Sequence, residues 1–163
     1  MHTTETCTTF HGVTNDLALD KQLCFALYAA SRATTAVYRP LLDELGITYP
    51  QYLVLLVLWE RDGRGVREIG SELDLDTGTL SPLLKRLEAL GLVERRRLPE
   101  DERRVQIHLT DTGRGLRDRA RDIPRRLAGC AGIAPGEAAE LRSTLTRLTH
   151  ALRDAAHHPP SPE

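Results

Sequence analysis

The feature that most constrains the fold of this chain is the order of hydrophobic patterns between Val66 and Leu109. Two helical patterns, over residues 66–73 and 76–90, are separated by only a few polar residues. Two helices joined by so tight a turn are typical of a helix-turn-helix. The sequence therefore predicts that the middle of the chain is built around such a helix pair.

A strand pair is predicted directly after these two helices. Gly91 is a residue that commonly follows a helix end, and residues 92–97 then favour a strand. Turn residues follow over 98–102, and the next strand shows alternation of period two, with apolar positions at Val105, Ile107 and Leu109. A β-hairpin directly behind a helix-turn-helix is the winged-helix arrangement. The expected fold is mostly α with a small β-hairpin wing.

The predicted helices before the helix pair cover residues 20–38, 41–45 and 51–61. Pro40 is expected to separate the first two, because proline cannot donate the hydrogen bond that a helix interior requires. Thr48 and Gln51 match the S/T-x-x-E/Q capping box at the start of the third.

Two further helices are predicted after the wing. Thr110 is expected to cap a helix that runs to about residue 128, and a last helix begins at Pro135. The last helix carries an apolar stripe at Leu141, Leu145, Leu148 and Leu152. Periodicity leaves two interpretations open: the stripe packs on its own domain, or it forms a dimer interface. DNA binding favours the second, because winged helices read pseudo-palindromes as dimers.

These patterns predict a single domain with short extensions. The expected parts are a flexible arm (1–15), one winged-helix domain (16–156) with dimerisation helices (16–46 and 111–156) around a DNA-binding region (47–110), and a flexible tail (157–163).

Composition places the chain among ordinary soluble proteins, since 40% of its 163 residues are hydrophobic and 28% are charged. No signal peptide or membrane-spanning run is present, so we expect a cytoplasmic protein without a membrane partner. The three cysteines and six histidines show no metal-ligand spacing, so no metal and no cofactor are expected. The net charge is only −1, and a nucleic-acid site must therefore come from local clustering of Lys and Arg.

Such clustering occurs on the second helix of the pair and on the hairpin. The candidate recognition helix offers Thr77, Thr79, Ser81, Lys85 and Arg86. The hairpin offers Arg95, Arg96, Arg97, Arg103 and Arg104. Acidic residues among these arginines also allow a solvated, salt-bridged surface. Because a wing tip can enter the minor groove, where arginine is favoured, phosphate and minor-groove contacts are the preferred interpretation.

Cys24 is the candidate reactive thiol, although a cysteine on an apolar helix is commonly an inert core residue. Tyr28 lies one helical turn away, and the phenols of Tyr38 and Tyr49 are further candidates to hydrogen-bond a thiolate. In a straight helix Tyr38 lies about 21 Å from Cys24 along the axis. It cannot reach the thiol of its own helix, but it can reach the partner subunit's Cys24 across a dimer axis.

The wing resembles that of the MarR (multiple antibiotic resistance regulator) family. The matching segments are Leu-Val-Glu-Arg-Arg at 92–96, Pro-Glu-Asp-Glu-Arg-Arg at 99–104 and Leu-Thr-Asp-Thr-Gly at 109–113, and the resemblance extends over about residues 20–153. It implies a dimer with interlocked N- and C-terminal helices, bound to a pseudo-palindromic operator in double-stranded DNA. It also implies that Asp101 braces the wing and that Arg103 enters the minor groove.

Further segments resemble the organic-hydroperoxide-sensing branch (OhrR) of that family. They are Leu-Cys-Phe-Ala-Leu-Tyr-Ala-Ala-Ser-Arg at 23–32, Tyr-Arg-Pro-Leu-Leu at 38–42 and Gly-Ile-Thr-Tyr-Pro-Gln-Tyr-Leu-Val at 46–54. The resemblance implies that Cys24 is oxidised to a sulfenic acid and is hydrogen-bonded by Tyr38 and Tyr49 of the dimer mate. Cys130 occupies the place of a second cysteine that forms an intersubunit disulfide in some members, whereas Cys7 matches nothing in that pattern.

The sequence therefore predicts a non-enzymatic, homodimeric DNA-binding repressor that senses organic hydroperoxides through Cys24. The resolving thiol stays open between Cys130, Cys7 and a small thiol. One alternative is a repressor released by a small phenolic or aromatic ligand, bound between the dimerisation helices and the wing domain. Another is a thiol peroxidase turning over on Cys24, in which the wing arginines would have no purpose.

Overall fold

The computed structural model describes residues 17–98 and 101–157 of the chain. The chain divides into two compact units at the junction between Ala36 and Val37. The first unit contains a 3-10 helix, Leu19–Lys21, and most of helix α1 (Leu23–Asp43), and the second contains the end of α1 and all later elements. The predicted arm over 1–15, with Cys7, and the end of the predicted tail lie outside the described residues.

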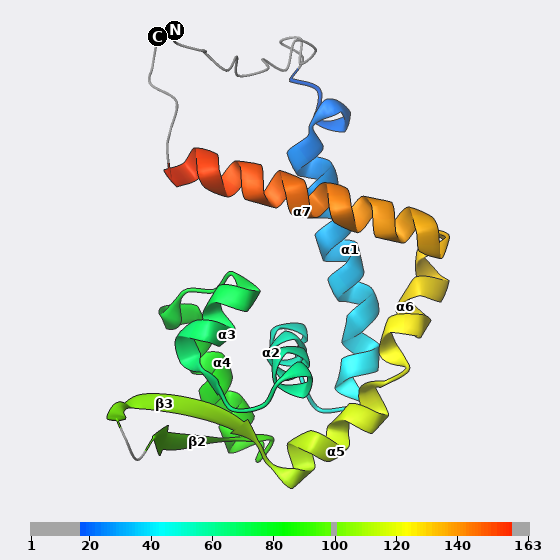
Figure 1. The fold of residues 1–163 in the computed structure, drawn as a ribbon. Coiled ribbons are helices and arrows are strands. Elements are labelled where there is room, and N and C mark those ends of the chain that lie inside the picture. The colour runs from blue at the N-terminus through cyan, green and yellow to red at the C-terminus, as the bar shows by residue number, and fades with distance from the viewer. Residues whose placement is uncertain (1–16, 99–100, 158–163) are drawn as a thin grey trace, which may run out of the picture. The chain divides into compact units, whose positions relative to one another are not determined.

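The second unit has the element order of a winged helix (Figure 1). Its elements are α2 (Tyr49–Glu60), β1 (Arg64–Gly65), α3 (Val66–Leu73), α4 (Thr77–Ala89), β2 (Val93–Leu98), β3 (Asp101–Leu109), α5 (Asp111–Ala120), α6 (Ile123–Ala131) and α7 (Pro135–His157). The predicted helix-turn-helix is α3 and α4, and the predicted hairpin is β2 and β3. The predicted fold class is confirmed.

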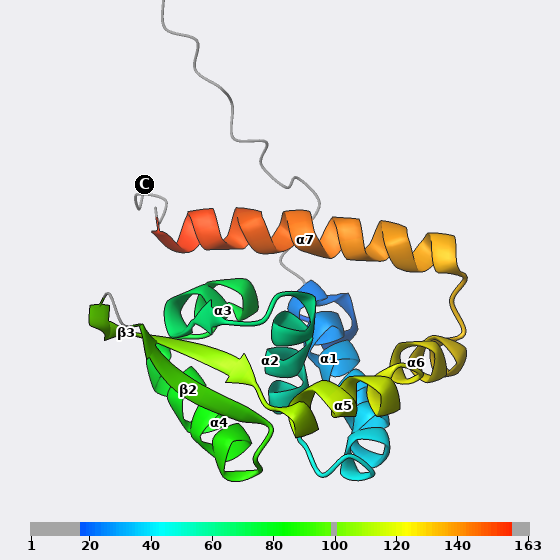
Figure 2. The ribbon, with the colours of Figure 1, turned by 60° about the horizontal axis from the view of Figure 1, so that its bottom comes forward.

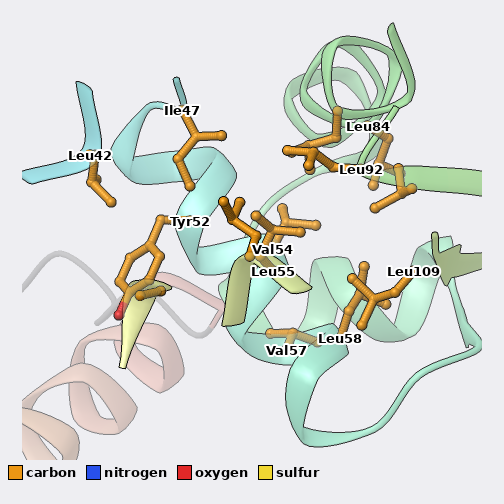
Figure 3. Packing of buried hydrophobic residues seen from close by; sticks show 14 of the residues in the cluster. Leu42, Ile47, Tyr52, Val54, Leu55, Val57, Leu58, Leu84, Leu92 and Leu109 are labelled. Carbon is orange, nitrogen blue, oxygen red and sulfur yellow. The ribbon is translucent and has the colours of Figure 1, made fainter. Parts of the chain in front are cut away.

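Helix α2 forms the centre of the core because it is apolar on nearly all sides. Val54 and Leu55 are fully buried, between Leu42 at the end of α1 and Leu92 before β2 (Figure 3). The predicted capping box is confirmed, since the backbone N–H of Thr48 donates to Oε1 of Gln51 at 2.7 Å. Each fully buried leucine or valine contributes roughly 1.5–3 kcal/mol to the free energy of unfolding.

The turn between α3 and α4 depends on close backbone approach. Asp74 ends α3 in the left-handed region with φ 56°, and the N–H of Leu75 donates to the carbonyl of Gly70 at 2.9 Å. A Cβ at Gly70 would lie 2.7 Å from the carbonyl oxygen of Leu75. Glycine at this position therefore permits the turn that places α4 against α3.

The wing is a three-stranded antiparallel sheet with the order β1-β3-β2. Val93 pairs with Leu109 in the hairpin, and Arg64 of β1 pairs with Ile107 on the other edge of β3. Figure 2 shows the hairpin beside α4, which contacts β2. The sequence missed β1, because a strand of two residues is too short to show an alternating pattern.

Helix α1 differs from its prediction, because residues 20–38 and 41–45 do not form separate helices. One helix runs from Leu23 to Asp43 with Pro40 inside it. Pro40 forfeits the hydrogen bond to the carbonyl of Ala36, at the junction of the two units. Burial of Leu41 and Leu42 offsets that loss, since packing of an apolar face stabilises helices more than local propensity does.

The predicted helix over 110–128 is also wrong in extent. Helix α5 ends at Ala120, and α6 begins at Ile123 with Pro124 in its first turn. Proline fits a first helical turn, where N–H groups have no intrahelical partner, and therefore favours a new helix start at this point. The predicted cap is confirmed, since Thr110 Oγ1 accepts from the N–H of Gly113 at 3.0 Å.

Candidate nucleic-acid interface and thiol site

Helix α4 presents a polar first turn because its apolar residues hold the other face in the core. Leu80, Leu84 and Leu87 are buried, whereas Lys85 and Arg86 are exposed. Asp76 caps the helix and accepts both from the N–H and from the hydroxyl of Thr79, each at 2.8 Å. These hydrogen bonds from Thr79 lower the pKa of Asp76.

The cap divides the three candidate hydroxyl groups of α4 into two classes. Thr79 Oγ1 already donates its proton to the Asp76 carboxylate and can offer an external ligand only its lone pairs. Thr77 is exposed and Ser81 half-buried, and neither hydroxyl has a hydrogen-bond partner within the described part of the chain. Thr77 and Ser81 are therefore the better donors to a phosphate oxygen.

The wing arginines also divide by their acidic neighbours. Arg95 Nε lies 3.3 Å from Glu88, and Arg96 forms an ion pair with Glu94. Arg97 is exposed and has no acidic partner among the described side chains of residues 17–97 and 105–156. The backbone of Asp101, Arg103 and Arg104 lies in β3, and their side chains are outside the described part of the structure. Of the hairpin arginines with described side chains, Arg97 is the one free to pair with phosphate.

A polar recess of about 750 Å³ lies between the start of α3, the first turn of α4 and the wing strands. Thr77 and Ser81 line it together with Arg67, Arg95 and Gln106. Arg67 is exposed and has no acidic partner within the described ranges. Sequence reasoning missed Arg67 and Gln106, because no local pattern shows that the start of α3 faces the start of α4.

Buried Arg64 fixes the position of α3 beside this recess. Its side chain is 9% exposed, and its Nη1 lies 2.8 Å from Glu72 of α3. Its Nη2 lies 3.8 Å from Glu60 at the end of α2. Because a buried charge is costly without partners, this arginine holds α2, β1 and α3 together.

Three tyrosines form a cluster at the junction of α1 and α2. The ring of Tyr38 lies 4.6 Å from that of Tyr49 and 5.8 Å from that of Tyr52. Burial, with smaller contributions from Tyr49 and Tyr52, raises the pKa of Tyr38 to about 12. Burial also raises the pKa of Tyr49 and of Tyr52. Tyr38 and Tyr49 therefore keep the phenolic proton that a donor to a thiolate needs. The sequence predicted these two phenols as candidate donors but missed Tyr52, whose ring packs beside that of Tyr38.

The raised pKa of Tyr38 predicts a specific alkaline destabilisation. Below pH 10 both the folded and the unfolded chain hold the phenolic proton. Between about pH 10 and 12 the unfolded chain loses it first, so the free energy of unfolding falls by up to about 1.4 kcal/mol per pH unit. We expect Tyr38→Phe to reduce this slope in denaturant titrations across that range. A slope equal to that of the wild type would contradict the assignment.

The two described cysteines and Tyr28 all have exposed side chains. Cys24 is exposed on α1 in the first unit, as is Tyr28, whose hydroxyl accepts from Arg32 at 2.9 Å. Cys130 is exposed on α6 in the second unit. Both thiols are accessible to a reagent in the single chain.

Helix α7 leaves its apolar stripe uncovered in the single chain. Leu141 is 51% exposed and Leu152 is 57% exposed, and Leu145 is also exposed. Leu148, the fourth residue of the stripe, is half-buried, so three of the four leucines remain exposed in the single chain.

The described residues contain neither a candidate metal site nor a candidate membrane-spanning helix. Among the side chains that the structure describes, no group of three or more His, Cys, Asp or Glu is arranged to hold a metal ion. Among the same residues, no helix combines the length and the hydropathy needed to cross a bilayer.

The chain is similar to known transcriptional regulators both in sequence and in fold. The profile of the transcriptional regulator SarA/Rot family matches residues 36–120. The chain is 52% identical over 140 residues to the HTH-type transcriptional regulator TtmR of Methylorubrum extorquens, covering 86% of this chain and 70% of the relative. It is 48% identical over 136 residues to the organic hydroperoxide resistance transcriptional regulator of Bacillus subtilis, covering 83% and 92%.

Among solved structures, reduced AbfR bound to DNA matches with a TM-score of 0.75 at 38% identity, covering 85% of this chain and 94% of that chain. AbfR is a protein of Staphylococcus epidermidis. A disulfide-formed state of AbfR matches with a TM-score of 0.58 at 37% identity, covering 85% of this chain and 92% of that chain.

Proposed function

This chain belongs to the SarA/Rot family of MarR-like winged-helix transcriptional regulators. We propose that it is a repressor that releases its operator DNA when organic hydroperoxides oxidise it. In this proposal it acts in the cytoplasm as a homodimer. Cys24 is the sensing thiol, and no cofactor takes part.

Operator binding is assigned to α4 and the wing. Thr77, Ser81, Lys85 and Arg86 are placed on the outer side of α4, and the hairpin supplies Arg97. Arg103 is proposed for the minor groove, with Asp101 bracing the wing. DNA binding by AbfR, which shares this fold, supports the assignment.

Sensing is assigned to Cys24 with the phenols of Tyr38 and Tyr49. The Cys24 thiolate attacks one oxygen of the peroxide, the O–O bond breaks, and the alkoxide takes up a proton to leave as an alcohol. The sulfur retains the hydroxyl group as a sulfenic acid, which condenses with a second thiol to a disulfide and water. Phenols that stay protonated stabilise the attacking thiolate by hydrogen bonding.

Dimerisation is assigned to the terminal helices, as the sequence predicted for residues 16–46 and 111–156. The exposed stripe of α7 supports this assignment, because an exposed apolar face of such length is typical of an interface. Two-fold symmetric regulators read half-sites about 34–36 Å apart. A change at the interface that alters this spacing would release the DNA.

The observation that carries the sensing proposal is the contact of buried Tyr38 with half-buried Tyr49, whose rings lie 4.6 Å apart, in a chain 48% identical to an organic hydroperoxide resistance regulator. The test is the affinity of the reduced protein for a palindromic promoter fragment, before and after an organic hydroperoxide. We expect tight binding before, loss after, and recovery with a thiol reductant. Unchanged affinity after complete oxidation of Cys24 would disprove the proposal.

A second candidate function rests on a surface pocket of about 530 Å³ between α2 and the α5–α6 region. Leu56 and Trp59 line one side, and Arg117 and Arg121 line the other. Glu60 and Asp118 also line the pocket, and Asp118 forms an ion pair with Arg121 at 3.1 Å, so the pocket fits an aromatic ring whose acidic substituent meets Arg117. Release of operator DNA from Cys24→Ser by a phenolic acid, without peroxide, would favour this function over thiol sensing.

The recess predicts a role for Arg67 in operator binding. We expect Arg67→Ala to weaken binding by about 1 kcal/mol and to reduce the slope of log affinity against log salt by about 1, since one phosphate contact is lost. The control is Arg147→Ala, which removes the same charge from α7 and is expected to leave the slope unchanged. Equal slopes for Arg67→Ala and wild type would exclude the contact.

A further inference from the structure

The tyrosine cluster continues along α2 to the only tryptophan of the chain. The ring of Tyr52 lies 5.8 Å from that of Tyr38 and 6.1 Å, edge to face, from that of Trp59. With Tyr49, these rings form an unbroken series of contacts, which we call the aromatic chain (Tyr38, Tyr49, Tyr52 and Trp59). Such ring pairs are specific in geometry and resist independent movement.

The far end of the aromatic chain is bonded to α5. Trp59 Nε1 donates to the carbonyl oxygen of Gly113 in the first turn of α5 at 2.9 Å. Indole nitrogen is a donor only, and the Gly113 carbonyl oxygen supplies its acceptor. Gly113 itself has no free space, because a Cβ there would lie 2.0 Å from the carbonyl oxygen of Leu92.

Leu92 is the residue that leads into the wing strand β2. Its carbonyl oxygen also accepts from the N–H of Thr110 at 3.1 Å, and Thr110 Oγ1 donates to the carbonyl of Gly91 at 2.6 Å. The first turn of α5 and the base of the wing are thus joined by backbone contacts. A displacement of Gly113 would act directly on Leu92.

We propose that Trp59 is a positioning residue. It transmits the redox state of the Cys24 thiol, which Tyr38 and Tyr49 bind, to the base of the wing. The inference rests on the proposed function, since it assumes that oxidation occurs beside these tyrosines. Oxidation removes the thiolate that the two phenols bind, and the rings repack. Because packed interiors shift between discrete arrangements, the change reaches Gly113 through Tyr52 and Trp59 and alters the angle at which the wing meets DNA.

The test measures the operator dissociation constant of reduced and peroxide-oxidised protein for the wild type and Trp59→Phe. Phenylalanine retains a ring but cannot donate to Gly113. We expect oxidation to raise the dissociation constant of the wild type at least about tenfold and that of Trp59→Phe less than about threefold. In the reduced state, Trp59→Phe should bind the operator with the same affinity as the wild type. Its Cys24 should also be oxidised at the same rate. Tyr52→Phe, which keeps the ring contact, is the matched control and should respond like the wild type.

The outcomes separate this inference from the proposed function. A wild type that keeps its DNA after oxidation overturns the proposed function. If oxidation releases DNA equally from the wild type and from Trp59→Phe, the inference is overturned. It is also overturned if Trp59→Phe already binds DNA more weakly than the wild type in the reduced state. The intrinsic fluorescence of Trp59 gives a second measurement. It should change when the wild type is oxidised and stay constant when Cys24→Ser is treated with peroxide. Constant fluorescence in the oxidised wild type would overturn the inference even if Trp59→Phe failed to fold.

Discussion

Replacing Cys24 with serine is expected to leave operator binding intact and to abolish release by organic hydroperoxides. A serine hydroxyl is close in size to the thiol but cannot be oxidised to a sulfenic acid. The reduced proteins should therefore bind alike, whereas peroxide should weaken only the wild type, by about tenfold or more, equivalent to about 1.4 kcal/mol. Gel-shift or anisotropy titrations with one promoter fragment measure both states. Peroxide-induced release from Cys24→Ser would place the sensing chemistry elsewhere.

The same samples identify the resolving thiol. We propose Cys130, because it is exposed on α6 and follows the second-cysteine pattern of the hydroperoxide-sensing branch. A covalent dimer is expected on non-reducing gels after oxidation of the wild type and of Cys7→Ser. It should be absent from Cys24→Ser and from Cys130→Ser. A dimer that survives in Cys130→Ser would assign the role to Cys7, and no dimer in any sample would indicate a small-molecule thiol.

Replacing Gly113 with alanine is expected to destabilise the fold strongly. Its Cβ would lie 2.0 Å from the carbonyl oxygen of Leu92, and that oxygen belongs to backbone held by Thr110. Overpacking of this kind costs roughly 1–3 kcal/mol, and the displaced carbonyl also weakens a hydrogen bond at the base of the wing. We expect the free energy of unfolding to fall by about 3 kcal/mol or more in denaturant titrations.

The matched control is Gly115→Ala in the same helix. A Cβ at Gly115 has nothing within 4 Å, and the residue is exposed. Alanine is favoured over glycine in a helix interior by up to about 1 kcal/mol, so this variant should be as stable as the wild type or more stable. Equal effects at the two positions would show that helix propensity, and not the approach to Leu92, determines the outcome.

The sequence by itself determined the elements whose boundaries depend on local chemistry. Asp76 and Thr110 cap helices with their own side chains, as predicted for Thr110, and Gly91 adopts a positive φ of 67° after α4. Each of these residues acts on backbone groups within a few positions of itself, so its effect is visible in the sequence. The helix pair and the hairpin, and with them the fold class, followed from such signals.

Only the tertiary structure decided the features that join distant segments. Leu41 and Leu42 keep α1 continuous through Pro40, which local propensity alone would have broken. Arg67 was found because the start of α3 borders the same recess as α4 and the wing.

The contact between Trp59 and Gly113 joins residues 54 positions apart and has no sequence signature. Its physical basis is packing: which side chains meet across a core depends on how whole helices are placed, and periodicity reports only which face of a helix is buried. The sequence therefore determined the helix pair, the hairpin and the chemistry of the candidate side chains, but not β1, the continuity of α1 or the division between α5 and α6. The packing of the end of α1, of α2 and of α5 decided which of those side chains lie in contact.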